Sequence, residues 1–583
     1  MVDEKIGMDK HQIAQILQEM SLLYELKGEN PFKIRAYQNA ARALENLNED
    51  LEQIILENRL REIEGIGEAM QSKILTLHET GTLLLYEELK AEIPEGLRSL
   101  LQIAGLGAKK VKTLYETLNI QSVEELKKAC QEKKVQKLEH FGEKTEQNIL
   151  QGIEHLEQYH KKDIWWKAWQ VASFLLKEIK KLPQVKEAEI AGSIRRKLET
   201  IGDVDLLVAS SDPKPVMDWF TKQSEITVTQ KGETKSSIRL KNGMQVDLRV
   251  ILPQEFVYAL HYFTGSKQHN IKIRQIAHEQ GHLLNEYGIF PIDSKTKPLF
   301  PKRKKVTEKD LFESLGLSYI PPEMREDLGE IEAAKKKQIP TLIEFEDIQG
   351  VFHCHTAESD GHNTLEEMVE GAQEFGWKYI GITDHSKSSV QANGLSEERL
   401  LDQIKKIEKL NQSKKYSIHV FAGTECDILI GGSLDFSDEI LKQLDFVIAS
   451  IHQPFKQDEK TITKRMIKAI EHPLTTMIAH PTGRLLLKRE PYPIDMQKVI
   501  DAAIANQKII ELNTNPYRLD MDWRLWHRAI DKGLLCSINP DAHHVDHYLF
   551  IHAGINVAKK GWITKDHVFN TWPISKIKKY LKR

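Results

Sequence analysis

Cysteine is scarce in this sequence, and long apolar runs are missing from it. The 583 residues include four cysteines, which lie far apart and form no C-x-x-C pair, so nothing indicates a disulfide framework or a cysteine zinc site. No apolar run approaches the roughly 18–20 residues that span a bilayer. The N-terminus, MVDEKIGMDKHQ, is charged from its start, unlike a secretory signal. We therefore expect a cytoplasmic protein.

An excess of one charge is also missing. Lys and Arg number 82 and Asp and Glu 85, for a net charge of −3, so no global basic field draws the protein to nucleic acid. Any contact with phosphate must be local, through clustered basic side chains or backbone amides. At roughly 100–200 residues per domain, the length predicts three to five domains. No feature indicates an oligomer, and we expect a monomer.

The residue pattern changes along the chain. Residues 1–160 alternate short amphipathic segments with glycine, which predicts helices joined by tight turns. Residues 185–255 alternate apolar and polar side chains around the step Asn242-Gly243, which predicts strands and a hairpin. Residues 319–345 are rich in proline and lysine, as is typical of a linker. From residue 346 onward strands and helices alternate, which predicts a parallel α/β domain.

The segment GSIRRKLETIGDVDLL, residues 192–207, concentrates residues that bind metal and phosphate. Alternate side chains of a strand share a face, so Asp203 and Asp205 project together. Alternation after the hairpin puts Asp247 on the polar face of a later strand, where it can join them. Such carboxylates can hold a pair of Mg²⁺ ions, and the preceding Gly-Ser turn offers backbone N–H groups to phosphate. We expect a two-metal site for a phosphate-bearing substrate.

Two turns of the form Gly-apolar-Gly precede lysine-bearing helices in the first 160 residues. Glycine lets the backbone approach a phosphate, and the N–H groups at the start of the next helix point toward it. Contacts of this kind bind the DNA backbone without reading its sequence and need little net positive charge. We therefore expect DNA contacts at Gly65, Gly67, Gly105 and Gly107.

The segments KIRAYQNAARAL and GIGEAMQSKI resemble the lyase domain of the family X DNA polymerases, the group of DNA polymerase beta. In that family a lysine forms a Schiff base with the deoxyribose left at an abasic site, and the resemblance gives this role to Lys73. Such a lysine needs a depressed pKa to act at neutral pH. Lys33 and Tyr37 match other positions of the pocket, whereas Ala69 replaces a phosphate-binding lysine.

The segment GSIRRKLETIGDVDLL is similar to the palm motif of the same family. The resemblance implies three residues that bind the triphosphate of the incoming nucleotide: Gly192, Ser193 and Arg196. It implies three carboxylates that hold two Mg²⁺ or Mn²⁺ ions: Asp203, Asp205 and Asp247. The metals activate the primer 3′-hydroxyl and neutralise the triphosphate. Gln245 stands where polymerase beta carries arginine, which is a departure beside the third acid.

The acids alone would also fit a template-independent nucleotidyltransferase, such as a CCA-adding or drug-modifying enzyme. The block YFTGS and the residues after it separate these classes, because they match the family's segment from palm into thumb. There a Tyr-Phe pair packs against the sugar, an asparagine touches the incoming base and an arginine meets the template. The matching residues are Tyr262, Phe263, Gly265, Asn270 and Arg274. The resemblance covers residues 1–318 and implies templated synthesis from dNTPs.

Apolar runs of the C-terminal part end repeatedly in metal-binding side chains. The carboxyl ends of the strands of an (α/β) barrel converge at one mouth, so these side chains are expected to meet there. Imidazole together with carboxylate suits Zn²⁺, Mn²⁺ or Fe²⁺. The nine positions are His353, His355, Asp360, His385, Glu425, His452, His480, Asp541 and His543.

This set resembles the PHP (polymerase and histidinol phosphatase) domain, over residues 346–583. That family uses a cluster of about three divalent metals to activate a water against a phosphoester. All nine positions are present, so the resemblance implies a catalytic domain with 3′→5′ exonuclease activity. Arg484 is a candidate for binding substrate phosphate, with a surface ion pair as the alternative.

We therefore expect a multidomain chain with an all-α helix-hairpin-helix N-terminal region, an α+β nucleotidyltransferase palm with a thumb, and a C-terminal distorted (α/β) barrel. The expected domains are a lyase-like helix-hairpin-helix domain (1–85), a fingers-like helical DNA-binding domain (86–160), the palm (161–262), the thumb (263–318), a linker (319–345) and the PHP domain (346–583).

The expected function is that of a DNA-directed DNA polymerase that fills short gaps in DNA repair and carries a metal-dependent 3′–5′ exonuclease. Abasic-site endonuclease and 5′-deoxyribose phosphate lyase activities are additional candidates. The expected partners are gapped or nicked DNA and dNTPs. Three alternatives stay open: a polymerase fused to a small-molecule phosphatase of the histidinol-phosphate kind, a template-independent nucleotidyltransferase, and a DNA-end scaffold without turnover.

Overall fold

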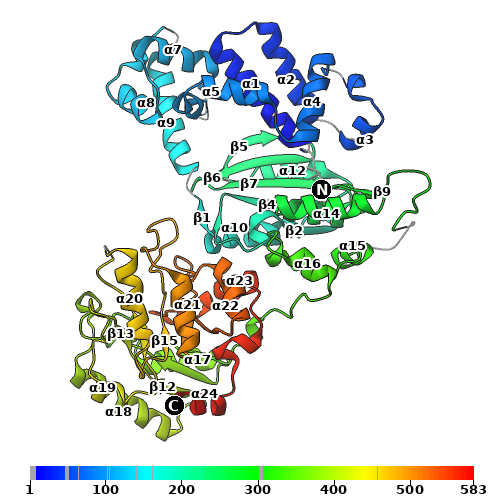
Figure 1. Ribbon diagram of the computed structural model, residues 1–583. Helices are drawn as coiled ribbons and strands as arrows, with labels where there is room; N and C mark the ends of the chain where they lie inside the picture. The colour runs from blue at the N-terminus through cyan, green and yellow to red at the C-terminus, as the bar shows by residue number, and fades with distance from the viewer. Residues whose placement is uncertain are drawn as a thin grey trace.

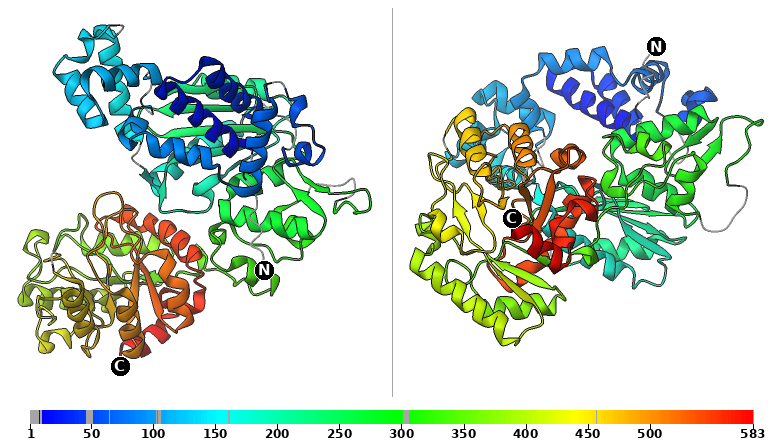
Figure 2. Two further views of the ribbon diagram at one scale, coloured as in Figure 1. Left: turned by 45° about the horizontal axis from the view of Figure 1, so that its top comes forward. Right: turned by 60° about the horizontal axis from the view of Figure 1, so that its bottom comes forward.

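The computed structural model describes residues 8, 10–45, 51–63, 65–101, 103, 106–139, 141–159, 162–224, 226–300, 306–455 and 457–582. Figure 1 shows a helical region at the top, a sheet with flanking helices in the middle and a mixed α/β domain at the bottom. The left view of Figure 2 again separates the α/β domain from the other two. None of the described helices combines the length and the apolar run that a membrane crossing requires.

The first region consists of short helices, as the glycine-interrupted pattern predicts. Gly67 and Gly107 precede helices α4 and α7 in extended conformation, so the chain turns just before each helix. Gly105 lies outside the described residues. One apolar core runs from Ile13 to Ile153 and joins the two helical domains predicted here. The elements are α1 (Lys10–Lys27), α2 (Pro31–Glu45), α3 (Leu51–Leu56), η1 (Leu60–Glu62), α4 (Glu68–Thr80), α5 (Leu84–Glu92), α6 (Glu95–Leu100), α7 (Ala108–Leu118), α8 (Val123–Gln131), η2 (Val135–Lys137) and α9 (Gly142–Tyr159).

The palm contains a mixed sheet with strand order β2-β4-β7-β6-β5. The predicted hairpin at Asn242-Gly243 joins β6 to β7, whose side chains alternate between buried and half-buried. Strand β7 also pairs in parallel with β4. The elements are β1 (Asp163–Ile164), α10 (Trp165–Ile179), β2 (Glu187–Ile190), α11 (Gly192–Arg195), β3 (Thr200–Ile201), β4 (Asp203–Ala209), α12 (Pro213–Thr221), β5 (Ile226–Lys231), β6 (Lys235–Leu240) and β7 (Gln245–Ile251).

The two faces of β4 have different partners. Val204 and Leu206 pack in the core that includes the buried side chains of α10 and α12. Leu207 and Ala209 pack instead against the apolar side chains of α13 (Phe256–Thr264). Because side chains alternate along a strand, the acids at the start of β4 share the face of Leu207. They therefore project toward the thumb.

The thumb follows the palm and includes most of the segment predicted as a linker. Ile320, Met324 and Ile331 are buried in the same core as Ile273 and Leu311, so residues 319–345 connect two domains while packing closely against the first. The remaining elements are α14 (Lys267–Glu279), β8 (His282–Leu284), β9 (Ile289–Pro291), α15 (Glu308–Ser314), η3 (Pro322–Met324) and α16 (Glu330–Lys335).

The C-terminal domain contains two parallel sheets, β10-β11-β12 and β13-β14-β15-β16-β17. Bridges between His385 and Glu425 and between Cys354 and Ala542 connect the sheets on both sides, which gives the distorted barrel that the sequence predicts. Its elements are η4 (Phe345–Asp347), β10 (Gly350–Val351), α17 (Leu365–Glu374), β11 (Tyr379–Ile382), η5 (Val390–Ala392), α18 (Glu397–Ser413), β12 (His419–Ala422), β13 (Glu425–Asp427), α19 (Asp438–Leu441), β14 (Ile448–Ser450), α20 (Glu459–Ile470), β15 (Met477–Ile478), α21 (Met496–Ala505), β16 (Ile509–Asn513), α22 (Trp523–Asp531), β17 (Leu535–Asn539), η6 (Val545–Phe550), α23 (Ile551–Lys560), η7 (Lys565–His567), η8 (Phe569–Thr571) and α24 (Ile574–Leu581).

Two candidate catalytic centres

Three carboxylates meet at the edge of the palm sheet. Asp203 and Asp205 extend from β4, and Asp247 lies beside Asp205 because β7 pairs in parallel with β4. The three acids can place one oxygen each within 4.8 Å of one another. Burial and the charges of Asp203 and Asp247 raise the pKa of Asp205 to about 7. A cation bound between such carboxylates would reduce the repulsion between their negative charges, and their oxygen donors suit Mg²⁺ or Mn²⁺.

The geometry requires a glycine beside this cluster. Gly192 has a φ of +60°, and a Cβ at this position would lie 1.9 Å from a carboxylate oxygen of Asp205. The turn that Gly192 and Ser193 begin therefore lies directly against the acids. A phosphate could bind here between a metal and the backbone N–H groups of the turn.

A cavity of about 520 Å³ opens next to the acids. Palm, thumb and helical region all contribute to its wall, the last through Met8 and Gly81. Within it Asn270 donates a hydrogen bond from Nδ2 to the carbonyl oxygen of Tyr262 at 2.7 Å. All eight residues predicted to bind the nucleotide line this cavity: Gly192, Ser193, Arg196, Tyr262, Phe263, Gly265, Asn270 and Arg274.

Two hydrogen bonds in series hold the third acid. Gln245, at the position that departs from polymerase beta, donates from Nε2 to Oδ1 of Asp247 at 3.0 Å. The amide oxygen of Gln245 accepts a hydrogen bond from Nη2 of Arg239 at 3.1 Å. An arginine therefore still acts on Asp247, but through the intervening amide, which fixes the direction of the carboxylate.

The candidate lyase residue lies on α4. Lys73 donates a hydrogen bond from Nζ to the carbonyl oxygen of Ala69 at 3.0 Å, and Nζ lies 5.8 Å from the ring centre of Tyr37. Tyr37 itself is buried in the helical core, and Lys33 is paired with Glu29. Burial, and next the charge of Lys33, lowers the pKa of Lys73. A lowered pKa is the property that a Schiff-base lysine needs.

A second cavity, of about 550 Å³, lies at the first hairpin. Gly65, with a φ of +96°, and Gly67 line it together with Arg35, Asn39 and Arg61. Backbone and guanidinium N–H groups in one hollow suit a phosphate of the DNA backbone. The first of the two predicted hairpins thus has the groups that such a contact requires.

The predicted ligands of the C-terminal domain meet around Glu425. Its Oε2 lies 3.0 Å from Nδ1 of His385 and 3.4 Å from Nε2 of His353. Its Oε1 lies 2.9 Å from Nε2 of His480 and 3.1 Å from Nε2 of His452. One carboxylate among four imidazoles is well placed to bridge metal ions.

The other predicted ligands adjoin this group. Nε2 of His355 lies 3.2 Å from Oδ1 of Asp541, and Nε2 of His543 lies 3.3 Å from Oδ1 of Asp360. Three sets of donors, each within 4.8 Å of one another, can be drawn from these side chains, and the sets overlap because some residues belong to two of them. The overlap is the arrangement that a cluster of neighbouring metals would need.

Buried polar atoms without a hydrogen bond support metal binding here. Among the described residues they include Nδ1 of His355 and Nδ1 of His480. Such atoms are costly to bury unless a metal takes their lone pairs. Against the effect of burial, nearby carboxylates raise the pKa of His385 to about 10 and that of His452 to about 9. Metals would displace these protons.

Two acids outside the predicted set lie beside predicted ligands. Oε1 of Glu511 lies 2.6 Å from Nδ1 of His353, and Oδ1 of Asp427 lies 2.7 Å from Nδ1 of His452. A hydrogen bond at one ring nitrogen fixes the direction of the other. Asp427 follows Glu425 by two residues on β13, and Glu511 interrupts the apolar run of β16. Both signals were present in the sequence.

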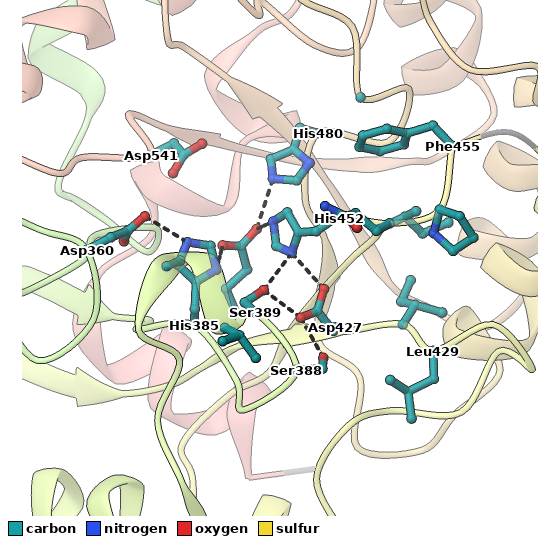
Figure 3. A pocket seen from close by; sticks show the side chains of 18 of the residues that line it. Asp360, His385, Ser388, Ser389, Asp427, Leu429, His452, Phe455, His480 and Asp541 are labelled. Atoms are coloured by element: carbon teal, nitrogen blue, oxygen red, sulfur yellow. Dashed lines mark hydrogen bonds and ion pairs between the residues drawn. The ribbon is translucent and has the colours of Figure 1, made fainter.

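Figure 3 shows the cavity over this cluster, with His385, His452 and His480 on one side and Leu429 and Phe455 on the other. Its volume is about 890 Å³. Arg465, Arg489 and Arg518 line it, whereas Arg484 does not. Arg484 is instead ion-paired with Glu199 of the palm, in a buried rather than a surface position. The guanidinium groups that line the cavity are therefore those of the other three arginines.

Four models of known families match separate segments of the chain. Residues 8–83 match a helix-hairpin-helix domain, and residues 97–154 match a SAM-like helix-hairpin-helix tandem. Residues 259–326 match the DNA polymerase beta thumb, and residues 352–515 match the PHP domain. The thumb match extends to residue 326, in agreement with the packing of that segment.

Whole-chain comparison finds a relative that matches this chain almost from end to end. The chain is 36% identical over 579 residues to the DNA polymerase/3′-5′ exonuclease PolX of Bacillus subtilis (strain 168), covering 99% of this chain and 100% of that protein. It is 32% identical over 243 residues to a probable phosphatase of Thermoanaerobacter sp. (strain X514), covering 40% of this chain and 93% of that protein. A probable phosphatase of Caldicellulosiruptor bescii is 36% identical over 169 residues, which cover 28% of this chain and 65% of that protein. The chain therefore belongs to the family X DNA polymerases that carry a C-terminal PHP domain.

Proposed function

We propose that the protein is a DNA-directed DNA polymerase that fills short gaps during DNA repair and removes 3′-terminal nucleotides with its PHP domain. One observation carries the polymerase proposal. Asp203 and Asp205, which cluster with Asp247, line a single cavity together with every residue expected to bind the incoming nucleotide. A scaffold without turnover would not need this convergence, so the non-enzymatic alternative lacks support.

Each group of the palm has a role in this proposal. The backbone of Gly192 and Ser193 and the guanidinium of Arg196 would bind the triphosphate, while Asn270 lies where it can contact the base. Asp203, Asp205 and Asp247 would hold two Mg²⁺ or Mn²⁺ ions. Bound metal would supply charge stabilisation for nucleotidyl transfer to the primer 3′-hydroxyl.

The PHP cavity supports phosphodiester cleavage. The nine ligands suit about three divalent ions, Mn²⁺, Zn²⁺ or Fe²⁺, which would supply an activated water. A cavity of about 890 Å³ is large enough for a nucleotide, and three arginines line it beside the ligands. The resemblance to probable phosphatases keeps a small phosphomonoester as the alternative substrate. Because the PHP domain is part of a chain with an N-terminal DNA-binding region, the 3′ end of DNA is the favoured substrate.

A 5′-deoxyribose phosphate lyase is a second candidate activity, favoured by the lowered pKa of Lys73. A lowered pKa increases the fraction of unprotonated amine, which is the form that attacks the aldehyde of the deoxyribose and, with loss of water, forms a Schiff base. Abasic-site cleavage by the PHP domain would use the same ligands as the exonuclease, and we propose it as an additional activity of that site.

The test uses the purified full chain on a 5′-phosphorylated one-nucleotide gap with Mg²⁺ or Mn²⁺. We expect extension of the primer when dNTPs are present and shortening of its 3′ end when they are absent. Extension without a template strand would favour the template-independent alternative. Release of phosphate from histidinol phosphate without any shortening of DNA would assign the PHP domain to small molecules.

A further inference from the structure

A lysine of the PHP domain is buried in the polymerase half of the molecule. Lys560 is the last residue of α23, and its side chain has an exposed fraction of 0%. Its Nζ donates hydrogen bonds to the carbonyl oxygen of Arg196 at 2.9 Å, to the carbonyl oxygen of Glu323 at 3.2 Å and to Oε1 of Glu326 at 2.7 Å. All three acceptors belong to the palm or the thumb.

The acceptor Glu326 is shared with the arginine of the nucleotide cavity. Oε1 of Glu326 accepts a hydrogen bond from Nε of Arg196 at 3.1 Å as well as the one from Lys560. Nη1 of Arg196 donates to the carbonyl oxygen of Thr264. Arg196 is therefore held at its backbone by Lys560 and at its side chain by Glu326 and Thr264, while it lines the cavity.

Burial of these charged groups raises the free energy of the folded protein unless each charge has a partner. A buried ammonium group needs an acceptor for each N–H group, and a buried carboxylate needs a cation. Glu326 accepts from both Arg196 and Lys560, so its single negative charge does not fully neutralise the guanidinium of Arg196, which lines the cavity. The guanidinium therefore keeps charge with which it can attract a triphosphate.

We infer that Lys560 is a positioning residue of the polymerase site, through which the PHP domain sets the direction of Arg196. The inference rests on the proposed role of Arg196 in binding the triphosphate. Lys560 shares the charge of Glu326 and anchors the carbonyl oxygen of Arg196 at the end of α11, the helix that begins with Gly192. Without Lys560, Glu326 would pair with Arg196 alone and withdraw it from the triphosphate.

The consequence is that nucleotide affinity depends on the docking of a domain that carries a different active site. No residue of the PHP metal cluster takes part in these contacts. A change at Lys560 should therefore alter the binding of dNTP and leave the removal of 3′ nucleotides intact. The adjacent Lys559 provides a matched control, because its Nζ bonds Glu344 at 2.6 Å, away from the nucleotide cavity.

The experiment measures single-nucleotide gap filling and 3′ shortening by full-length Lys560→Met and Lys559→Met. We expect Lys560→Met to raise the KM for dNTP at least about fivefold, as for coupled sites of this kind. We expect a smaller change in kcat, because an interaction made equally in the ground state and the transition state acts on KM. Shortening should proceed at the wild-type rate, and Lys559→Met should match the wild type in both reactions.

Further variants keep the inference testable if Lys560→Met misfolds. Lys560→Arg preserves the charge and should keep the KM close to that of the wild type. Glu326→Gln should raise the KM, and the double variant Lys560→Met/Glu326→Gln should be no worse than the poorer single variant, because the two residues act on one group. Fully additive losses, or an unchanged KM in Lys560→Met, would overturn the inference.

An Arg196→Ala variant separates the two levels of the proposal. If Arg196→Ala leaves the KM for dNTP unchanged, the proposed role of Arg196 itself is wrong. If Arg196→Ala raises the KM and Lys560→Met does not, Arg196 binds the triphosphate without help from the PHP domain, and only the inference about Lys560 fails.

Discussion

Arg484 of the PHP domain and Glu199 of the palm form a buried ion pair. Nη2 of Arg484 donates to Oε1 of Glu199, and Nη1 lies 3.1 Å from Oδ2 of Asp522. The exposed fractions of Glu199 and Arg484 are 9% and 6%. Burial raises the pKa of Glu199 to about 7, although Arg484 acts in the opposite direction. The palm segment that carries the metal-binding acids is thereby tied to the PHP domain.

We expect Arg484→Met to destabilise the protein by about 3–5 kcal/mol, because it leaves a buried carboxylate unpaired. The loss should be larger at pH 8 than at pH 6. A carboxyl group with a raised pKa contributes stability below its unfolded pKa and loses that contribution as the pH rises through its folded pKa, near 7 for Glu199. Without Arg484 that pKa rises further, so more stability is lost at pH 8.

Unfolding in urea at both pH values measures this effect. The double variant Glu199→Gln/Arg484→Met serves as the control, since it removes the unpaired charge and should recover part of the stability. Equal destabilisation of Arg484→Met at pH 6 and pH 8 would show that the charge of Glu199 is not its cause.

Binding of Mg²⁺ to the palm should depend on pH around neutrality. The pKa of Asp205 is raised to about 7 by burial and by the adjacent acids, so below pH 7 a proton competes with the metal. Affinity should fall by about tenfold for each pH unit below 7 if one proton is displaced. Calorimetric titration of the protein with Mg²⁺ at pH 6 and pH 8 measures this affinity. Asp247→Asn is the control, because it removes a metal-binding side chain of the palm site. An affinity that does not change with pH would contradict this account.

Replacement of Gln245 should weaken the palm site alone. Gln245 links Arg239 to Asp247, and loss of such an orienting hydrogen bond costs about 10–100-fold in metal affinity or activity. We expect Gln245→Ala to slow extension by this factor and to raise the Mg²⁺ concentration needed for half-maximal rate. Shortening of the 3′ end, measured in the same preparation, should be unchanged. A variant that extends at the wild-type rate would remove Gln245 from the site.

Lys73 should become covalently attached to DNA that ends in a 5′-deoxyribose phosphate when borohydride is added, because a Schiff base is reduced to a stable amine. Lys73→Gln should abolish the attachment. Lys90→Gln is a matched control, since Nζ of Lys90 also lies over a tyrosine ring, 4.9 Å from the centre of that of Tyr86. If Lys73→Gln became attached to this DNA as efficiently as the wild type, the amine that forms the Schiff base would belong to another residue.

Local pattern predicted most of the two centres. Strand alternation put Asp203 and Asp205 on one face, and the Asn-Gly step predicted the hairpin that precedes Asp247. Most of the predicted ligands of the PHP domain follow an apolar run, and Asp360 in the segment ESDG is the exception. A barrel brings the ends of its strands together. The sequence did not indicate that β7 pairs in parallel with β4, which is what places Asp247 beside Asp205.

Contacts between domains were not predictable in the same way. Arg484 was a candidate for phosphate, yet it pairs with Glu199, which lies 285 residues away in the sequence. Lys560 is 364 residues from Arg196. Neither pair belongs to a local motif. The docking of folded domains decides which charged side chains meet at an interface, and a local sequence pattern does not show it. The segment 319–345 is similar: its prolines and lysines suggest a linker, but its buried apolar residues complete the thumb.

In the proposed function one chain carries a polymerase site in the palm and an exonuclease site in the PHP domain, and each site has its own metal-binding side chains. Asp247→Asn and Glu425→Gln test it most directly, on the same gapped DNA with and without dNTPs. We predict that Asp247→Asn loses extension and keeps shortening, whereas Glu425→Gln keeps extension and loses shortening. Loss of both activities in either variant, or retention of extension by Asp247→Asn, would contradict the account.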